Sequence, residues 1–391
     1  MLSIERTDKS ILGRWWWTVD RWLMASLFGL ALAGIILVMA ASPAVADRIG
    51  LNSFHFVIRH IIFLVPSIFI MISLSFLDAR NIWRAGSALC AGAFVMMVAT
   101  LIFGSDVKGA TRWIHLFGFS LQPSEFAKPA LAVTAAWLIT KQHAQPKFPG
   151  MLSATGVYLV FLCLLLLQPD LGMSFVLSLI WGTQIFLAGL SFTLVALLGV
   201  LGIGGLIGAY YVFPHVQSRI DRFLNPAAGD NYQIQKSLES FHEGGLLGTG
   251  PGDGNIKMYL PDAHADFIFA VAGEEFGLLL TLMLIGLFAF VMFRGLSRAW
   301  SSKDMFCILA VTGIMVQFGA QAFIHMGSSL QLLPAKGMTL PFVSYGGSSL
   351  VSLGIAMGFV LALTRKDQSK DLFSSSLPTA TPTIRPTRPY F

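Results

Sequence analysis

The sequence predicts an all-α polytopic membrane protein with about ten transmembrane helices and a large extracytoplasmic loop between helices 7 and 8. Its composition, its apolar runs and its distribution of positive charge predict this fold class. Hydrophobic residues make up 55% of the 391 residues, charged residues make up only 12%, and the mean hydropathy is +0.71. Soluble domains carry about 25% charged residues, so this chain has too little polar side chain to cover a water-facing surface. The composition excludes a soluble enzyme, a disordered chain and a fibre.

The apolar runs number about ten, and most approach the roughly 20 residues that a helix needs to cross a hydrocarbon core. The fourth run is short, and only the tight turn Gly189-Leu190-Ser191 divides the sixth run from the seventh. The first run ends in a sequence that resembles a signal-peptidase site, but it is longer than a signal-peptide core, so we expect an uncleaved anchor. The predicted spans lie near 22–43, 55–77, 84–104, 126–141, 152–168, 171–189, 191–213, 266–293, 304–325 and 342–363.

Positive charge orients the predicted bundle. With ten spans both termini lie on one side of the membrane, and 16 of the 26 Lys and Arg residues fall on that side. Because cytoplasmic loops carry the excess of Lys and Arg, both termini are predicted to be cytoplasmic. The connections 105–125, 214–265 and 326–341 then face outward, and long ordered loops are usually functional. The working face is therefore predicted to be extracytoplasmic.

The chain is predicted to form one membrane-embedded domain. Residues 1–21 form a cytoplasmic N-terminal segment, 22–365 the transmembrane domain, and 366–391 a cytoplasmic tail whose Ser, Thr and Pro content indicates disorder. The net charge of +6 does not indicate nucleic-acid binding, because the basic residues are scattered between apolar runs. The three cysteines lie inside apolar runs without CxxC spacing, which argues against disulfides and cysteine metal sites.

A glycine-rich run occupies residues 244–252 of the long outer loop. It lacks the lysine of a phosphate-binding loop, and no GxxxxGK[ST] motif occurs in the chain. We therefore expect a flexible outer turn here instead of a nucleotide site.

Three carboxylates stand at or inside the eighth predicted span, where charges are costly and often functional. Asp266 falls at the outer start of the span, where stabilisation by the helix dipole is the structural alternative to a functional role. Glu274 and Glu275 lie about 12–13.5 Å deeper, so at least one needs a buried partner. Candidate partners are Gln317, Gln321 and His325, which share one face of the ninth span. Hydrogen bonding between helices is the structural alternative for these three residues.

Positive residues gather at the predicted outer boundary of the membrane. These are Lys108, Arg112, Lys128 and Lys336, a set that suits an anionic headgroup such as pyrophosphate. Glu125 and Lys128 could also form a plain i,i+3 ion pair that opens a helix.

These residues lie in motifs that resemble the SEDS (shape, elongation, division and sporulation) family of bacterial cell-wall polymerases. The family's LPEAHTDFIFA element is similar to Leu260–Ala270, and Thr and Glu in that element are replaced here by Ala265 and Asp262. His325 stands where the family commonly has Asn. The segment around Lys336 is more similar to division-type members than to elongation-type members. The other matching elements are Gly109–Trp113 (GATRW), Gln122–Glu125 (QPSE) and Leu332–Ser349 (LLPAKGMTLPFVSYGGSS), and the resemblance covers about 20–365.

The resemblance implies a glycosyltransferase that polymerises lipid II, a disaccharide-pentapeptide on undecaprenyl pyrophosphate, at the outer face of the bacterial plasma membrane and at the division site. Such chemistry needs a base at the acceptor hydroxyl and positive charge at the departing pyrophosphate. Asp266 is the implied catalytic base, and Trp113 is expected to pack against a sugar or lipid face. The pyrophosphate-binding candidates are Arg112, Lys128 and Lys336; the supporting residues are Glu125, His264, Glu275 and Ser344.

The implied partners are lipid II, membrane lipid, a class B penicillin-binding protein and other division-complex proteins. A divalent cation (Mg or Mn) is compatible with the chemistry, but the sequence shows no ligand set and no metal residue is assigned. Two other functions stay open from the sequence: a lipid II flippase, and a noncatalytic scaffold for the penicillin-binding protein. We find no inverted repeat or paired broken helices of the kind that transporters show, which favours the enzyme.

Overall fold

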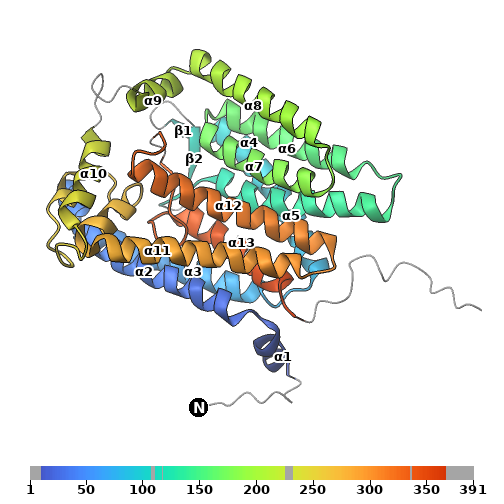
Figure 1. Cartoon of the computed structure of the whole chain (residues 1–391), viewed down its shortest axis with the longest axis horizontal. Coiled ribbons are helices and arrows are strands. Elements are labelled where there is room, and N and C mark those ends of the chain that lie inside the picture. The colour runs from blue at the N-terminus through green and yellow to red at the C-terminus, as the bar shows by residue number, and fades with distance from the viewer. Residues whose placement is uncertain (1–9, 107–110, 117, 225–231, 335–336, 367–391) are drawn as a thin grey trace, which may run out of the picture.

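The computed structural model describes residues 10–106, 111–116, 118–224, 232–334 and 337–366. Long helices lie side by side and form one elongated bundle (Figure 1). The elements are α1 (Ile11–Thr18), α2 (Arg21–Arg48), α3 (His55–Leu74), α4 (Ala79–Phe103), β1 (Ser105–Asp106), β2 (Thr111–Leu116), β3 (Phe119–Leu121), α5 (Pro123–Ala144), α6 (Gly150–Leu167), α7 (Leu171–Leu187), α8 (Phe192–Val212), α9 (Pro214–Leu224), α10 (Tyr232–Gly244), the 3-10 helix η1 (Ile256–Tyr259), α11 (Ile268–Trp300), α12 (Met305–Ser329) and α13 (Gly347–Leu363).

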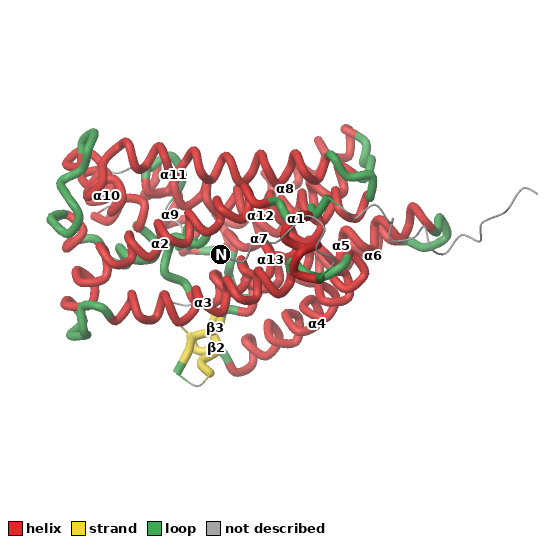
Figure 2. Tube along the Cα trace, turned by 90° about the horizontal axis from the view of Figure 1, so that it is seen from below, coloured by secondary structure: helices red, strands yellow, loops and turns green. Residues whose placement is uncertain are grey.

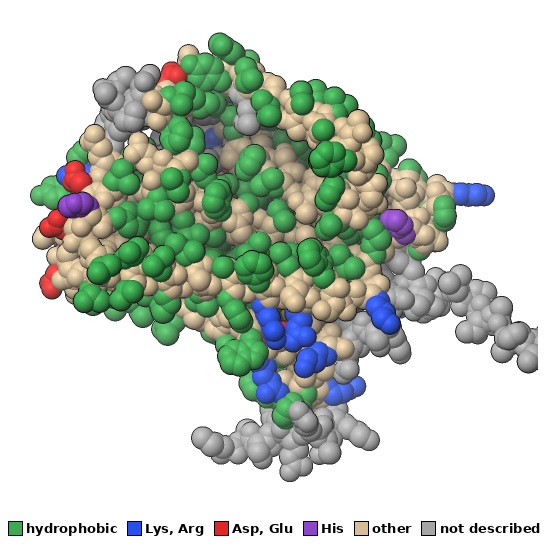
Figure 3. Space-filling view, in the orientation of Figure 1, with side chains coloured by type: hydrophobic (Ala, Val, Ile, Leu, Met, Phe, Trp, Pro, Cys, Tyr) green, Lys and Arg blue, Asp and Glu red, His purple; other side chains and the backbone are tan. Residues whose placement is uncertain are grey.

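Each of the ten predicted apolar runs contains a helix, which confirms a helical membrane protein. Within the described ranges, α2, α3, α4, α6, α8, α11 and α12 are long and apolar enough to cross a membrane, and α7 and α13 are shorter apolar helices. Apolar side chains cover much of the length of the bundle (Figure 3). Because hydrocarbon cannot satisfy backbone polar groups, continuous helices are the expected form of each span.

The central helix of the bundle is α5. It is buried along most of its length and packs against α4, α6, α7, α12 and α13. This surrounding protein explains how a helix with Glu125 and Lys128 near its start can lie among apolar neighbours. By contrast, α8 is exposed along most of its length at the edge of the bundle (Figure 1).

The bundle has two different ends. The strands, α9, α10 and the turn before α11 lie at one end, which we call the loop end (Figures 1 and 2). The other end carries α1 and the last turns of α11 and α13, and we call it the terminal end (Figure 1). The described parts of two connections that were predicted to face outward, 105–125 and 214–265, lie at the loop end.

A small sheet at the loop end was not expected from the sequence. Strands β1, β2 and β3 pair antiparallel in that order, with Ile114 opposite Leu121. Gly118 turns the chain between β2 and β3 with φ +80°, a conformation that glycine adopts without strain. The all-α prediction is therefore incomplete at this loop.

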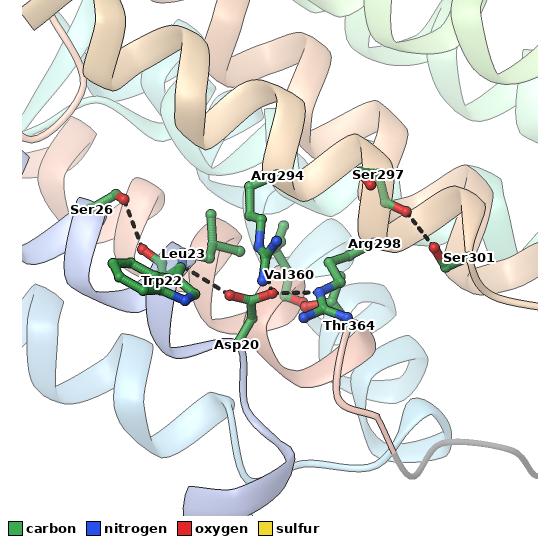
Figure 4. A network of polar contacts seen from close by, with 10 residues as sticks. All are labelled: Asp20, Trp22, Leu23, Ser26, Arg294, Ser297, Arg298, Ser301, Val360 and Thr364. Atoms are coloured by element: carbon green, nitrogen blue, oxygen red, sulfur yellow. Dashed lines mark hydrogen bonds and ion pairs between the residues drawn. The ribbon is translucent and has the colours of Figure 1, made fainter.

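At the terminal end, α2 and α11 are joined by one carboxylate (Figure 4). Asp20 caps α2 by accepting the Leu23 N–H at 3.1 Å, and its Oδ2 pairs with Arg294 Nε at 2.9 Å and Arg298 Nε at 2.5 Å. Burial acts to raise the pKa of Asp20, but the Leu23 N–H and the two guanidinium groups outweigh it and hold the pKa below its usual value. Lys and Arg side chains gather on this end beside α1 (Figure 3).

Candidate functional site at the loop end of the bundle

Asp266 lies in a tight turn that leads into α11. The turn is closed by the N–H groups of Ala265 and Asp266, which both donate to the Asp262 carbonyl at 2.9 Å. Since α11 begins at Ile268, Asp266 precedes the helix instead of forming its first turn as predicted. Its side chain is half-buried. The turn therefore presents this carboxylate at the loop end while it keeps contact with protein.

The loop 337–345 forms one wall beside this carboxylate. A Cβ on Gly337 would stand 2.8 Å from Asp266 Oδ2, so the backbone of this loop lies directly against the carboxylate. Ser344 ties the two segments together, because its hydroxyl donates to the Ala265 carbonyl at 2.8 Å and accepts the Leu340 N–H at 2.8 Å. The structure thus brings Asp266 and Ser344 together, two residues that the resemblance assigned to one site.

His264 lies beneath the turn as a packed, neutral ring. It stacks on Phe56 with ring centroids 3.9 Å apart and contacts Tyr345 at 5.2 Å. Burial lowers the pKa of His264 to about 4, although the nearby Asp262 acts to raise it. The imidazole therefore supports the turn as an aromatic surface and carries no charge near neutral pH.

Serine residues of α13 connect this wall to α5. Ser349 shares a 2.6 Å hydrogen bond with Thr339, and the Ser348 hydroxyl accepts the Gln122 N–H at 2.9 Å. One turn further, Ser352 donates to the Glu125 carbonyl at 2.7 Å. None of these hydroxyls was predicted as a site residue, although they lie in or just after the matched element Leu332–Ser349.

Glu125 and Lys128 form a buried ion pair. Lys128 Nζ lies 2.8 Å from Glu125 Oε2, and the lysine side chain has no exposed surface. Within the described part of the chain neither of these two atoms has a hydrogen-bond partner. The i,i+3 pair predicted as the structural alternative is therefore present, and it closes Lys128 off from solvent.

Arg112 is engaged by the turn between α6 and α7. Its guanidinium donates to the carbonyls of Gln168 and Pro169, and Nε lies 3.7 Å from Asp170 Oδ2. The side chain keeps 23% of its surface exposed. Trp113 follows it on β2 and is half-buried. The remaining predicted cations, Lys108 and Lys336, lie outside the described residues.

Glu274 and Glu275 both have buried partners, which come from the outer loop. Glu274 accepts the Ile256 N–H at 2.6 Å and the Lys257 N–H at 2.8 Å. Glu275 accepts the Gly252 N–H at 3.0 Å and pairs with the Lys257 ammonium. The prediction that at least one glutamate needs a buried partner is confirmed, but the candidate partners on α12 were wrong. Lys257 was missed because nothing in local spacing relates it to residues 17 or 18 positions later.

The glycine-rich run is a packed loop, contrary to the flexible turn that we expected. Thr249 and Gly250 donate their N–H groups to the carbonyls of Glu274 and Glu275 at 2.9 and 3.1 Å. A Cβ on Gly248 would stand 2.1 Å from the Glu275 carbonyl oxygen, so only glycine allows this approach. The loop meets α11 where that helix is interrupted at Gly277, with φ 72° and ψ −171°. The loop therefore fills a break in the helix.

The polar stripe of α12 is fully buried. Gln317 and Gln321 make no side-chain hydrogen bond in the described part of the chain, and His325 makes one, through Nδ1 to the Met338 carbonyl at 2.6 Å. Among the described residues, His325 is thus the member of the stripe whose side chain bonds to the loop 337–345.

No metal site emerges from the described residues. Within those ranges no three His, Cys, Asp or Glu side chains come together in a group that could hold an ion.

Together, the fold and the site define an integral membrane protein whose half-buried carboxylate and buried ion pairs gather at one end of a helical bundle. The chain belongs to the cell cycle protein family of FtsW, RodA and SpoVE, whose model matches residues 21–369. The SEDS resemblance inferred from the motifs is thereby confirmed.

Named relatives cover nearly the whole chain. A probable peptidoglycan glycosyltransferase FtsW of Caulobacter vibrioides (strain NA1000 / CB15N) is 43% identical over 365 residues, which are 93% of this chain and 94% of that protein. The protein of the same name from Coxiella burnetii (strain RSA 493 / Nine Mile phase I) is 34% identical and covers 90% of this chain and 98% of its own.

Solved structures share the fold. A chain from a peptidoglycan synthase complex that coordinates polymerization and crosslinking superposes with a TM-score of 0.74 at 25% identity, over 90% of this chain and 99% of that chain. The rod shape determining protein RodA of Thermus thermophilus superposes with a TM-score of 0.64 at 22% identity, over 91% and 99%. The second match supports the fold alone.

Proposed function

We propose that this chain is a peptidoglycan glycosyltransferase that polymerises lipid II at the outer face of the plasma membrane during cell division. The observation that carries the proposal is the half-buried carboxylate of Asp266 at the loop end, in a chain whose relatives are named peptidoglycan glycosyltransferases. General bases must lie at the reacting hydroxyl, and among the candidate site residues this carboxylate is the base that combines partial exposure with a fixed position.

In this mechanism Asp266 accepts the proton of the acceptor sugar's 4-hydroxyl. The freed oxygen attacks the anomeric carbon of the donor, a new glycosidic bond forms, and the bond to undecaprenyl pyrophosphate breaks. The pyrophosphate leaves with its negative charge, which nearby cations stabilise. Arg112 and Lys336 are the candidates for direct contact, with Trp113 packing against a sugar or lipid face. Lys128 reaches a pyrophosphate only if the protein that surrounds it moves, because its side chain is fully buried.

The same proposal sets topology and partners. The loop end faces outward, both termini are cytoplasmic, the ten helices cross the membrane, and residues 22–365 form one catalytic domain with the tail 366–391 outside it. The partner is a class B penicillin-binding protein, which crosslinks the strands that this chain makes. Support comes from the relative found within a peptidoglycan synthase complex.

The test is polymerisation of lipid II by purified protein in detergent, with the penicillin-binding partner present. Asp266→Asn keeps the size of the side chain and removes its basicity, so we expect about a 10²–10⁴-fold loss of strand formation. Asp262→Asn is the matched control, because Asp262 is an exposed carboxylate in the same turn and asparagine tolerates its φ of 54°. The control should keep wild-type activity.

The alternatives give other outcomes. A flippase moves lipid II across a bilayer and forms no glycosidic bond. The wild type would then make no glycan in detergent, and Asp266→Asn would fail only in vesicle translocation. A noncatalytic scaffold would make no glycan and translocate nothing, yet it would still bind its partner. Equal strand formation by wild type and Asp266→Asn would remove Asp266 from the mechanism.

A further inference from the structure

The last turns of α12 hold the wall of the Asp266 site through one side chain. His325 is fully buried, and its Nδ1 lies 2.6 Å from the Met338 carbonyl oxygen. Since a carbonyl only accepts hydrogen bonds, Nδ1 carries the proton and donates it. This bond links the interior of α12 to the loop 337–345.

The bonded peptide lies next to the carboxylate. Gly337 immediately precedes Met338, and its backbone lies so close to Asp266 that an added Cβ would stand 2.8 Å from Oδ2. His325 thus fixes the backbone that supports Asp266 from one side. From the other side, Ser344 ties the same loop to the Ala265 carbonyl.

His325 itself is anchored in the bundle. The hydroxyls of Ser328 and Ser329 both donate to its carbonyl oxygen at 3.0 Å. The Ser329 carbonyl in turn accepts the hydroxyl of Ser237 on α10 at 2.7 Å. The end of α12 is therefore tied to α10 through the Ser329 carbonyl, and a displacement of the loop 337–345 relative to this end requires the His325 bond to break.

We propose that His325 is a positioning residue that sets the place of the Asp266 carboxylate through the backbone of Gly337 and Met338. The inference rests on the proposed function, in which Asp266 is the base. His325 touches no substrate in this scheme. Its contribution is geometric, and a displacement of about 1 Å at a reacting group can cost about 10²-fold in rate.

Three substitutions separate the donor from the ring. His325→Asn keeps an N–H donor on the atom bonded to Cγ, where His carries Nδ1, so it should retain a kcat close to wild type. His325→Leu keeps the branching at Cγ without a donor, and we expect kcat for lipid II polymerisation to fall about ten- to a hundredfold with KM little changed. His325→Gln keeps polarity but moves the donor one bond outward, so it should also lower kcat. This variant tests the position of the donor if the leucine variant fails to fold.

A measurement without catalysis tests the same link. Hydrogen exchange of the amides in 337–345, in purified detergent-solubilised protein, should accelerate in His325→Leu and His325→Gln and stay at the wild-type rate in His325→Asn. In an Asp266→Asn background, His325→Leu should cause little further loss of activity, because it acts through the carboxylate that is already absent.

Each outcome decides a separate point. Wild-type kcat and exchange in both His325→Leu and His325→Gln would overturn the positioning role, and so would an Asn variant as slow as the Leu variant. If the wild type makes no glycan while exchange still separates Asn from Leu, the proposed function fails and the structural link stands.

Discussion

The carboxylate of Asp266 lies against the α-carbon of Gly337, so that a methyl group on Gly337 would stand 2.8 Å from Oδ2 and 3.3 Å from Cγ. The φ angle of Gly337 lies outside the left-handed region, so a side chain here would meet a steric contact with the carboxylate and no backbone strain. The contact joins the turn before α11 to the loop before α13. A side chain at position 337 can be accommodated only if the carboxylate or the loop moves.

Gly337→Ala should therefore displace the Asp266 carboxylate. We expect kcat for strand formation to fall about ten- to a hundredfold, since the base loses its alignment with the acceptor hydroxyl. Gly286→Ala on α11 is the control, because a Cβ there meets nothing within 4 Å and alanine favours a helix. Initial rates of lipid II polymerisation check both variants. A Gly337→Ala enzyme with wild-type kcat would show that the close contact does not position the base.

The sequence predicted the helices of the bundle well because a membrane helix must satisfy its backbone internally and must be apolar over many consecutive residues. It also assigned Asp266 and Ser344, from two different motifs, to one site, and the Ser344 hydroxyl donates to the carbonyl of Ala265 beside Asp266. What it missed depends on long-range contacts. Lys257 reaches Glu275 across a loop with no regular period, and the packing of Gly248 on α11 follows from a helix break that periodicity cannot show.

The buried pair of Glu125 and Lys128 should be costly to break on one side only. Lys128→Met leaves a buried carboxylate without its partner, and we expect the free energy of unfolding in detergent to fall by about 3–5 kcal/mol. The double variant Glu125→Gln with Lys128→Met removes both charges and should recover most of that loss. Denaturant unfolding monitored by circular dichroism would measure it.

The double variant also separates stability from substrate binding at Lys128. If the lysine additionally binds pyrophosphate, the stable double variant should show a raised KM for lipid II. If the stability losses of Lys128→Met and Glu125→Gln sum to the loss of the double variant, the two residues are not a coupled pair.

The Asp20 cluster at the terminal end should make stability depend on pH in the acid range. The pKa of folded Asp20 is lowered, so its contribution is fully present above the unfolded value of about 3.9 and is lost as pH falls through the folded pKa. Thermal melts of wild type and Asp20→Asn between about pH 6 and pH 3 should therefore converge at the acid end. Asp78→Asn, which removes an exposed partner of Arg365, is the control and should change the melting temperature little. If the difference in melting temperature between wild type and Asp20→Asn does not change with pH, the ion pairs of Asp20 do not contribute as expected.

The orientation of the bundle decides whether Asp266 can meet lipid II outside the cell, and two exposed positions test it. Glu243 lies at the end of α10 at the loop end, and Lys303 lies in the turn between α11 and α12 at the opposite end. In a background with Cys90, Cys163 and Cys307 replaced by serine, Glu243→Cys should react with a membrane-impermeant thiol reagent in intact spheroplasts. Lys303→Cys should react only after permeabilisation, because the excess of Lys and Arg places its end in the cytoplasm. Labelling of Lys303→Cys but not Glu243→Cys in intact spheroplasts would place the Asp266 turn in the cytoplasm, where strands made by this chain could not reach the wall.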